Sequence, residues 1–175
     1  MQPDPHTPSC NSRDAHAYHE EAHAETVLLE QQLCFTVYAV SREITKLYQP
    51  LLKALNLTYT QYITMLVLWE LRETTMKALG ERLLLDSGTL TPLLKKLETQ
   101  GLVTRRRDRR DERSLQVVVT EAGLALQEKA RHIPECLLQM VGGTPEAADD
   151  LRLRLSAALD ILRNREPIIN NVNDV

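Results

Sequence analysis

Apolar residues recur three or four positions apart along most of the chain, which is the spacing of one face of an α-helix. The first such stretch covers about 27–55. Pro50 is expected to break or kink it, because proline lacks a backbone N–H. Further helical segments are predicted at about 58–71, 76–84, 86–100, 121–140 and 145–165. The pattern therefore favours a mainly helical protein.

The helical spacing gives way to two short strands at 103–106 and 115–120. The second is indicated by three consecutive β-branched valines at 117–119, and the connection between the strands is charged. In the helix before them, Asp86 or Ser87 is a suitable N-cap. Pro92 is tolerable only near the first turn, which leaves the start of this helix open by a few residues.

The composition is that of a folded, helical protein, and its positive charge is concentrated in one segment. Of 175 residues, 43% are hydrophobic and 26% charged, with only six glycines, which suits one domain with a core and favours helices over a β-sandwich. The net charge is −3, yet the segment from Lys95 to Arg113 holds eight Lys or Arg and four Asp or Glu. The chain is therefore acidic overall, with one local basic segment.

The two ends of the chain carry little apolar pattern. Residues 1–25 are polar and contain three early prolines, so we expect a disordered arm, and 166–175 should form a loose tail. His19 and His23 could share a helix face, but no accompanying carboxylates or cysteines have metal-ligand spacing. No nucleotide-binding glycine motif or Ser/His/Asp arrangement occurs. We therefore expect no metal, no cofactor and no enzymatic activity.

The cysteines and the hydropathy pattern bear on the compartment. The sequence has no 18-residue apolar run and no basic, then apolar, leader, so no membrane span and no secretory signal are predicted. Three widely spaced cysteines form no disulfide framework. We expect a cytoplasmic protein, in which a disulfide would act as a switch.

A helix, a short turn, a second helix and a basic two-stranded loop follow in the order of a winged helix-turn-helix. The second helix has the length to enter a major groove, with donors on one side and leucines on the other. Arg113 is our choice for groove insertion, held extended by Asp111, while the arginines at 105–107, 109 and 110 contact phosphates or nothing. The alternative is a charged hairpin whose side chains are solvated and have no role in DNA binding. The expected donors on the helix are Ser87, Thr89, Thr91, Lys95 and Lys96.

A single winged module buries little DNA surface, so such proteins usually bind palindromes as dimers. The terminal helices hold more leucines than one small core needs, which suits a homodimer, although a larger monomeric core could also absorb them.

Cys34 lies in an apolar segment, between Leu33 and Phe35. Only a thiolate attacks a peroxide, so a sensor cysteine needs donors or positive charge around its sulfur. Tyr38 is one helical turn away on the same face and could supply a hydroxyl. The apolar neighbours would favour organic peroxides over hydrogen peroxide. The alternative is a small buried hydrophobe, the usual fate of a free cysteine.

These motifs resemble a known family. The segments 86–98 and 111–114 look like those of the MarR family of dimeric winged-helix repressors, whose motif adds Gly88 and Pro92 to the expected DNA-binding residues. The segments 33–35, 41–46 and 59–62 are similar to its organic-hydroperoxide-sensing branch, the OhrR type, and the resemblance covers roughly 30–165. It implies a mainly α fold with a small β wing, a DNA-binding domain at 59–120 and dimerisation helices at 26–58 and 121–165.

The resemblance also assigns roles around the thiol. It implies that Tyr48 and Tyr59 donate to the thiolate of Cys34 across a dimer interface. A straight helix would separate Cys34 from Tyr48 by roughly 21 Å, so either the chain folds back after Pro50 or a partner subunit supplies the phenol. Cys136 matches the second cysteine of the two-cysteine kind, which forms an intersubunit disulfide, with a core cysteine as the alternative.

The sequence thus predicts a repressor that binds palindromic operator DNA when Cys34 is reduced and is released by organic hydroperoxides. Two alternatives remain open. One is a MarR-type repressor released by a phenolic ligand, and the other is a thiol peroxidase, which would leave the basic wing unexplained. Cys10 is assigned no role.

Overall fold

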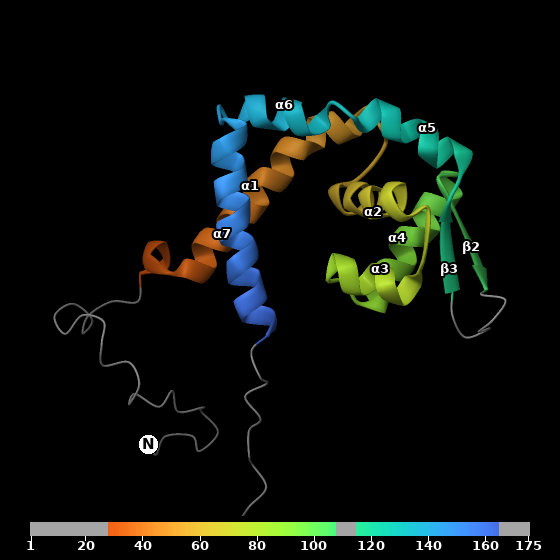
Figure 1. The fold of residues 1–175 in the computed structure, drawn as a ribbon, viewed down its shortest axis with the longest axis horizontal. Coiled ribbons are helices and arrows are strands. Elements are labelled where there is room, and N and C mark those ends of the chain that lie inside the picture. The colour runs from red at the N-terminus through yellow and green to blue at the C-terminus, as the bar shows by residue number, and fades with distance from the viewer. Residues whose placement is uncertain (1–27, 108–114, 165–175) are drawn as a thin grey trace, which may run out of the picture. The chain divides into compact units, whose positions relative to one another are not determined.

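The computed structural model describes residues 28–107 and 115–164, shown in Figure 1. The polar arm at 1–25, with Cys10, His19 and His23, lies outside the described residues, as do Asp111, Arg113 and the tail at 166–175. Two compact units divide the chain at 42/43, and each is described by itself.

The first unit contains a short 3-10 turn, Leu29–Gln31, and the beginning of helix α1, Leu33–Lys53. The helix starts later than the apolar pattern suggested, and it is not broken at Pro50. The predicted break at Pro50 was wrong for a physical reason. Proline removes only one backbone donor here, close to the end of the helix, and Leu52 in the last turn is buried in the core, which holds that turn in place.

The second unit contains the predicted helix-turn-helix and wing. It runs through α2 (Tyr59–Leu71), β1 (Glu73–Thr75), α3 (Met76–Leu83), α4 (Ser87–Thr99), β2 (Val103–Arg107) and β3 (Leu115–Val119). The three strands form an antiparallel sheet in the order β1-β3-β2, so β2 is an edge strand among the described residues. The sequence pattern missed β1, because three residues are too few to show alternation.

Side-chain caps fix where these helices begin. Thr58 and Gln61 form a reciprocal capping box at α2. Asp86 accepts the backbone N–H of Thr89 at 2.9 Å, so α4 begins at Ser87 and Pro92 is its sixth residue. The expectation that Pro92 is tolerable only near the first turn was wrong, because the helix continues past it at the cost of one backbone donor.

The core of the second unit is made by leucines of α2, α3 and α4 together with the inner valines of the sheet. Met65, Leu68 and Leu94 are fully buried. Trp69 donates its indole N–H to the carbonyl of Gly123 at 2.7 Å. Gly123 has no room for a side chain, because a Cβ there would come within 2.2 Å of the Leu102 carbonyl oxygen. This packing fixes the wing and α4 against α2.

Three helices follow the wing, α5 (Glu121–Ala130), α6 (Ile133–Met140) and α7 (Pro145–Arg163). The predicted single helix at 121–140 is interrupted, because Pro134 occupies the first turn of α6, where its missing N–H is harmless. None of the residues of α7 is buried. Within the described chain, no helix combines the length and apolar character needed to cross a bilayer.

Candidate DNA interface and redox site

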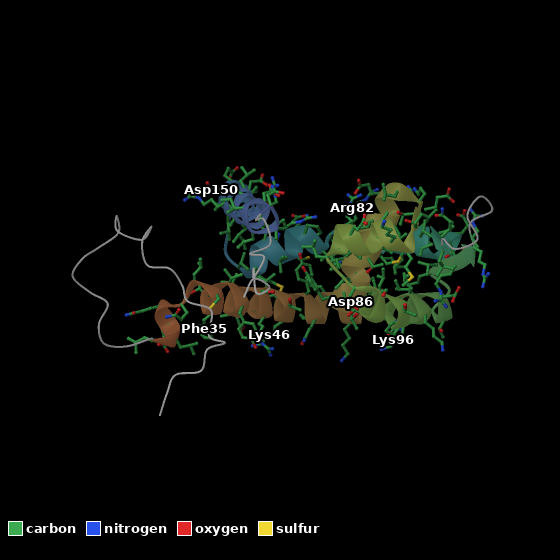
Figure 2. All side chains as sticks on the ribbon, turned by 90° about the horizontal axis from the view of Figure 1, so that it is seen from below. Phe35, Lys46, Arg82, Asp86, Lys96 and Asp150 are labelled. Carbon is green, nitrogen blue, oxygen red and sulfur yellow. The ribbon has the colours of Figure 1, made fainter. Side chains whose placement is uncertain are left out.

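Helix α4 has one buried and one exposed face, as a recognition helix requires. Its leucines enter the core, while Lys95 and Lys96 are exposed on the other side; Figure 2 labels Lys96 and Asp86 on this helix. The predicted donors are not all free. Thr89 donates its hydroxyl to Asp86 at 2.8 Å, and Thr91 donates to the Ser87 carbonyl at 2.7 Å.

The N-cap residue of α4 carries a stabilised negative charge. Hydrogen bonds from the backbone and the hydroxyl of Thr89 lower the pKa of Asp86, so its carboxylate stays charged at the positive end of the helix dipole. Gly88 leaves space beside this cap, since a Cβ there would lie 2.9 Å from Asp86 Oδ1. The cap therefore holds the N-terminus of α4, the helix that carries the residues expected to contact DNA.

Two of the arginines expected to contact phosphates, or nothing, are paired inside the chain. Arg105 binds Glu98 of α4 with its guanidinium at 2.6 and 2.9 Å, and Arg106 binds Glu73 at 2.8 Å. Each arginine therefore has a carboxylate partner within the chain: Glu98 lies on α4, and Glu73 lies across the sheet on β1. Their contact with phosphates stays a prediction. Arg107, at the end of β2, is exposed.

A groove of about 1070 Å³ lies beside α4. Its walls come from the end of α1, the start of α2 and the later turns of α4, with Pro92 among them. Lys53, Lys95 and Lys96 line it, and its lining contains no acidic residue. The three lysines give the lining of the groove a positive charge, which favours an anion.

The first unit presents Cys34 as a free, exposed thiol. In the single chain, Cys34 is therefore not a buried hydrophobe. Phe35 and Tyr38 lie near each other on the same helix, with ring centroids 6.5 Å apart. Arg42 donates to the Tyr38 hydroxyl at 3.2 Å and stacks over its ring. An accessible sulfur thus lies in a segment with aromatic and cationic side chains.

The second unit gathers tyrosines into a cluster. The Tyr48 ring lies 5.0 Å from that of Tyr59 and 5.7 Å from that of Tyr62, and Tyr62 packs edge-on to Trp69. Burial, reinforced by Tyr59 and Tyr62, raises the pKa of Tyr48 to about 12. Burial also raises the pKa of Tyr62. Tyr48 and Tyr62 therefore keep their protons at neutral pH and remain hydrogen-bond donors.

Sequence reasoning paired Tyr48 with Tyr59 but did not assign a role to Tyr62. Its position three residues after Tyr59 on one helix was the signal that could have found it. Tyr38 belongs to the first unit, whereas the tyrosine cluster belongs to the second. Cys136, in α6, is a free and half-buried thiol. The described residues contain no group of three or more His, Cys, Asp or Glu placed to hold a metal ion.

Comparison with known proteins identifies the family of this chain. It is 52% identical over 134 residues to the "Organic hydroperoxide resistance transcriptional regulator" of Bacillus subtilis, covering 77% of this chain and 89% of that protein. The chain belongs to the MarR family, in its OhrR-type branch. The sequence pattern of the SarA/Rot transcriptional regulators also matches residues 46–130 of this OhrR-type regulator.

Solved structures agree with this OhrR-type assignment. Reduced AbfR bound to DNA is 34% identical, with a TM-score of 0.64 over 78% of this chain and 96% of that one. A disulfide form of AbfR is 37% identical, with a TM-score of 0.55 over 75% and 92% of the two chains. AbfR is a protein of Staphylococcus epidermidis. The predicted winged-helix fold is therefore confirmed, and the protein is a transcriptional regulator of the OhrR type.

Proposed function

We propose that this regulator is a repressor, that it binds palindromic operator DNA as a homodimer while Cys34 is reduced, and that organic hydroperoxides release it. One observation carries the proposal: the thiol of Cys34 is free and exposed, in a chain 52% identical to an organic hydroperoxide resistance regulator. The names of the AbfR structures, reduced on DNA and disulfide-bonded, support the same cycle.

The DNA-binding part rests on α4 and the wing. Lys95 and Lys96 offer exposed cations, and Ser87, Thr89, Thr91 and the flanking Gly88 and Pro92 form the helix surface between them and the cap. Arg113, with Asp111 beside it, is proposed to enter the minor groove. Cationic side chains of this kind suit phosphates and groove edges, whereas the acidic remainder of the chain would oppose unspecific binding.

The dimer is proposed to form through the terminal helices. Leu33 is 80% exposed and Ile161 is 65% exposed, which is unusual for such large apolar side chains in a monomer. Leucines of α7 add to this exposed apolar surface. A second copy of the chain would cover it and would place two recognition helices on the two halves of a palindrome.

The chemical step begins with the thiolate of Cys34. Its sulfur attacks the outer peroxide oxygen, the O–O bond breaks, and the alkoxide leaves as an alcohol after taking a proton. The sulfur is oxidised to a sulfenic acid, and the peroxide is reduced. Phenols suit this step because a hydrogen bond from a phenol hydroxyl stabilises a thiolate relative to the thiol. We propose that Tyr38 and, from a second copy of the chain, Tyr48 and Tyr59 are these donors.

Cys136 is proposed to resolve the sulfenic acid. The thiol of Cys136 from a second copy attacks the Cys34 sulfur, an S–S bond forms, and the hydroxyl leaves as water. Because disulfide-bonded Cα atoms lie within about 7 Å, forming this bond would constrain the helices that carry the two cysteines. A constraint of this kind, acting on the spacing of the recognition helices, would weaken operator binding.

The test uses an operator duplex that the full reduced chain selects from a random DNA pool. Fluorescence anisotropy should show release by cumene hydroperoxide, and Cys34→Ser should bind equally well but ignore the oxidant. Cys136→Ser is the matched control: its Cys34 should still be oxidised, and further up the oxidation ladder, yet it should form no cross-linked dimer on a non-reducing gel. A Cys34→Ser protein that is still released by the peroxide would refute the proposal.

A second candidate is favoured by the groove beside α4. A phenolic carboxylate could bind its three lysines and release the repressor without any change at Cys34. Adding salicylate to Cys34→Ser separates the two readings. Release of this variant by salicylate, together with indifference of the unmodified protein to cumene hydroperoxide, would favour the ligand-gated repressor.

A further inference from the structure

Glu98 is the only carboxylate of α4, and its position is unfavourable for the helix itself. It lies in the last turn, where the negative end of the helix dipole disfavours an acidic side chain. On a recognition helix it would also repel DNA phosphates. Its presence calls for a compensating contact, and the structure provides one.

Both oxygens of Glu98 are used by Arg105 of β2. Oε1 accepts the backbone N–H of Arg105 at 3.1 Å, while Oε2 accepts Nε at 2.9 Å and Nη2 at 2.6 Å. The pair is the least exposed of the ion pairs in the described residues, with side-chain exposures of 22% for Arg105 and 36% for Glu98. Hydrogen bonds from the Arg105 side chain lower the pKa of Glu98, so the carboxylate stays ionised.

The contact holds the main chain of the wing as well as a side chain. Because β2 is an edge strand, its outward N–H groups have no neighbouring strand to accept them. Glu98 takes one of these donors, as a strand would. Arg105 is two residues before Arg107, where β2 ends, so the strand is fixed to α4 just before the wing loop departs.

We infer that Glu98 is a positioning residue that sets the wing on the recognition helix and, in the same contact, withdraws the Arg105 cation from DNA. The inference rests on the proposed operator binding and deepens it. Its consequence is selectivity: a fixed wing meets DNA in one geometry, and one fewer free arginine lowers attraction to any sequence. Glu98 itself need not touch DNA.

Glu98→Gln tests this, because the amide keeps the size of the side chain but loses the charge that holds the guanidinium. Binding by the full reduced chain is measured to the selected duplex and to a scrambled duplex, over a series of salt concentrations. The ratio of the two affinities should fall on the order of tenfold. The salt slope on the scrambled duplex should steepen by about one, because Arg105 becomes free to contact a phosphate.

Two further variants separate positioning from general stability. Glu98→Gln combined with Arg105→Gln should return the scrambled-duplex slope to the wild-type value, because no cation is freed, while the affinity ratio stays low. Glu128→Gln, which removes an exposed pair with Arg131 in α5 and the turn after it, should change neither quantity. Thermal melts of all variants report any loss of folding.

The outcomes are distinct. If the wild-type chain selects a duplex and Glu98→Gln matches it in ratio and slope, the inference is wrong and the proposed function stands. If Glu98→Gln lowers the melting temperature alone, the pair is structural and the inference is equally wrong. A wild-type chain that selects no duplex refutes the proposed function together with this inference.

Discussion

The winged region and the terminal helix α7 use leucine in opposite ways. In α4 the leucines at 90, 93, 94 and 97 are buried, whereas in α7 every residue is exposed, including the leucines at 151, 153, 155, 159 and 162. Both helices have comparable amphipathic patterns in the sequence. The difference teaches that a helical apolar face predicts burial without saying whether the same chain or another one provides the covering surface.

The largest effect is expected in the winged region. Leu94→Ala should lower the free energy of unfolding by roughly 2–5 kcal/mol, because it empties space in a fully packed core. Urea unfolding at fixed protein concentration measures this. A loss well below 1 kcal/mol would mean that the core collapses around the vacancy or is loosely packed.

The next largest effect is expected on DNA affinity, with no effect on dimer formation. Arg113→Ala should cost about 1–3 kcal/mol of operator binding, because one charge-assisted contact is lost, and should leave the dimer intact. Anisotropy titration and sedimentation measure the two properties separately. Equal operator binding by the variant and the unmodified protein would remove Arg113 from the interface.

A surface leucine in each region makes the comparison sharper. Leu155→Ala in α7 should weaken self-association by about 1–2 kcal/mol, since the proposed dimer would bury part of this exposed side chain. Leu66 of α2 is the matched control, being 43% exposed against 45% for Leu155. Analytical ultracentrifugation should find Leu66→Ala unchanged. Identical association of all three proteins would place the dimer contact elsewhere.

The smallest effect concerns Tyr48. Its pKa rises from 10.0 to about 12 on folding, because burial disfavours the phenolate. The folded state thus holds this proton more tightly than the unfolded state. The resulting stability is complete below the unfolded pKa and is lost as pH rises through the folded one.

Tyr48→Phe should therefore flatten the decline of unfolding free energy across this alkaline window and change it little at neutral pH. Urea unfolding over a series of alkaline buffers measures the slope. Tyr38→Phe is the control, because that ring is 55% exposed. Parallel curves for Tyr48→Phe and the unmodified chain would contradict the assigned cause.

The elements that depend on local pattern were predictable from the sequence. Three such local signals are the cap at Asp86, the leucine face of α4 and the valines of β3. Together with the family resemblance, they predicted the winged-helix fold. Packing between elements is not a local signal, so two ion pairs escaped prediction: Arg105 with Glu98, where β2 meets α4, and Arg106 with Glu73, across the sheet. Pro50 misled because its cost depends on how firmly the buried Leu52 holds the following turn.

The candidate site also contains features that the sequence predicted and features that only the tertiary structure shows. Tyr48 and Tyr59 lie together, and Tyr62, whose spacing from Tyr59 was the overlooked signal, joins them through the packing of α1 against α2. The roles of Cys34, Cys136 and the DNA-reading side chains remain proposals with stated tests. A single chain carries them only in part, because a second subunit and a duplex are their expected partners.

The chain contains one tryptophan, and its surroundings make it a built-in optical reporter. Trp69 is 4% exposed, with its indole N–H bonded to the Gly123 carbonyl and its ring beside Tyr62. Its emission should be blue-shifted in the native protein and should move to longer wavelength only when this interior opens to water. Intrinsic fluorescence can thus follow unfolding of the winged region without a label, while light scattering tests the proposed dimer and its dissociation.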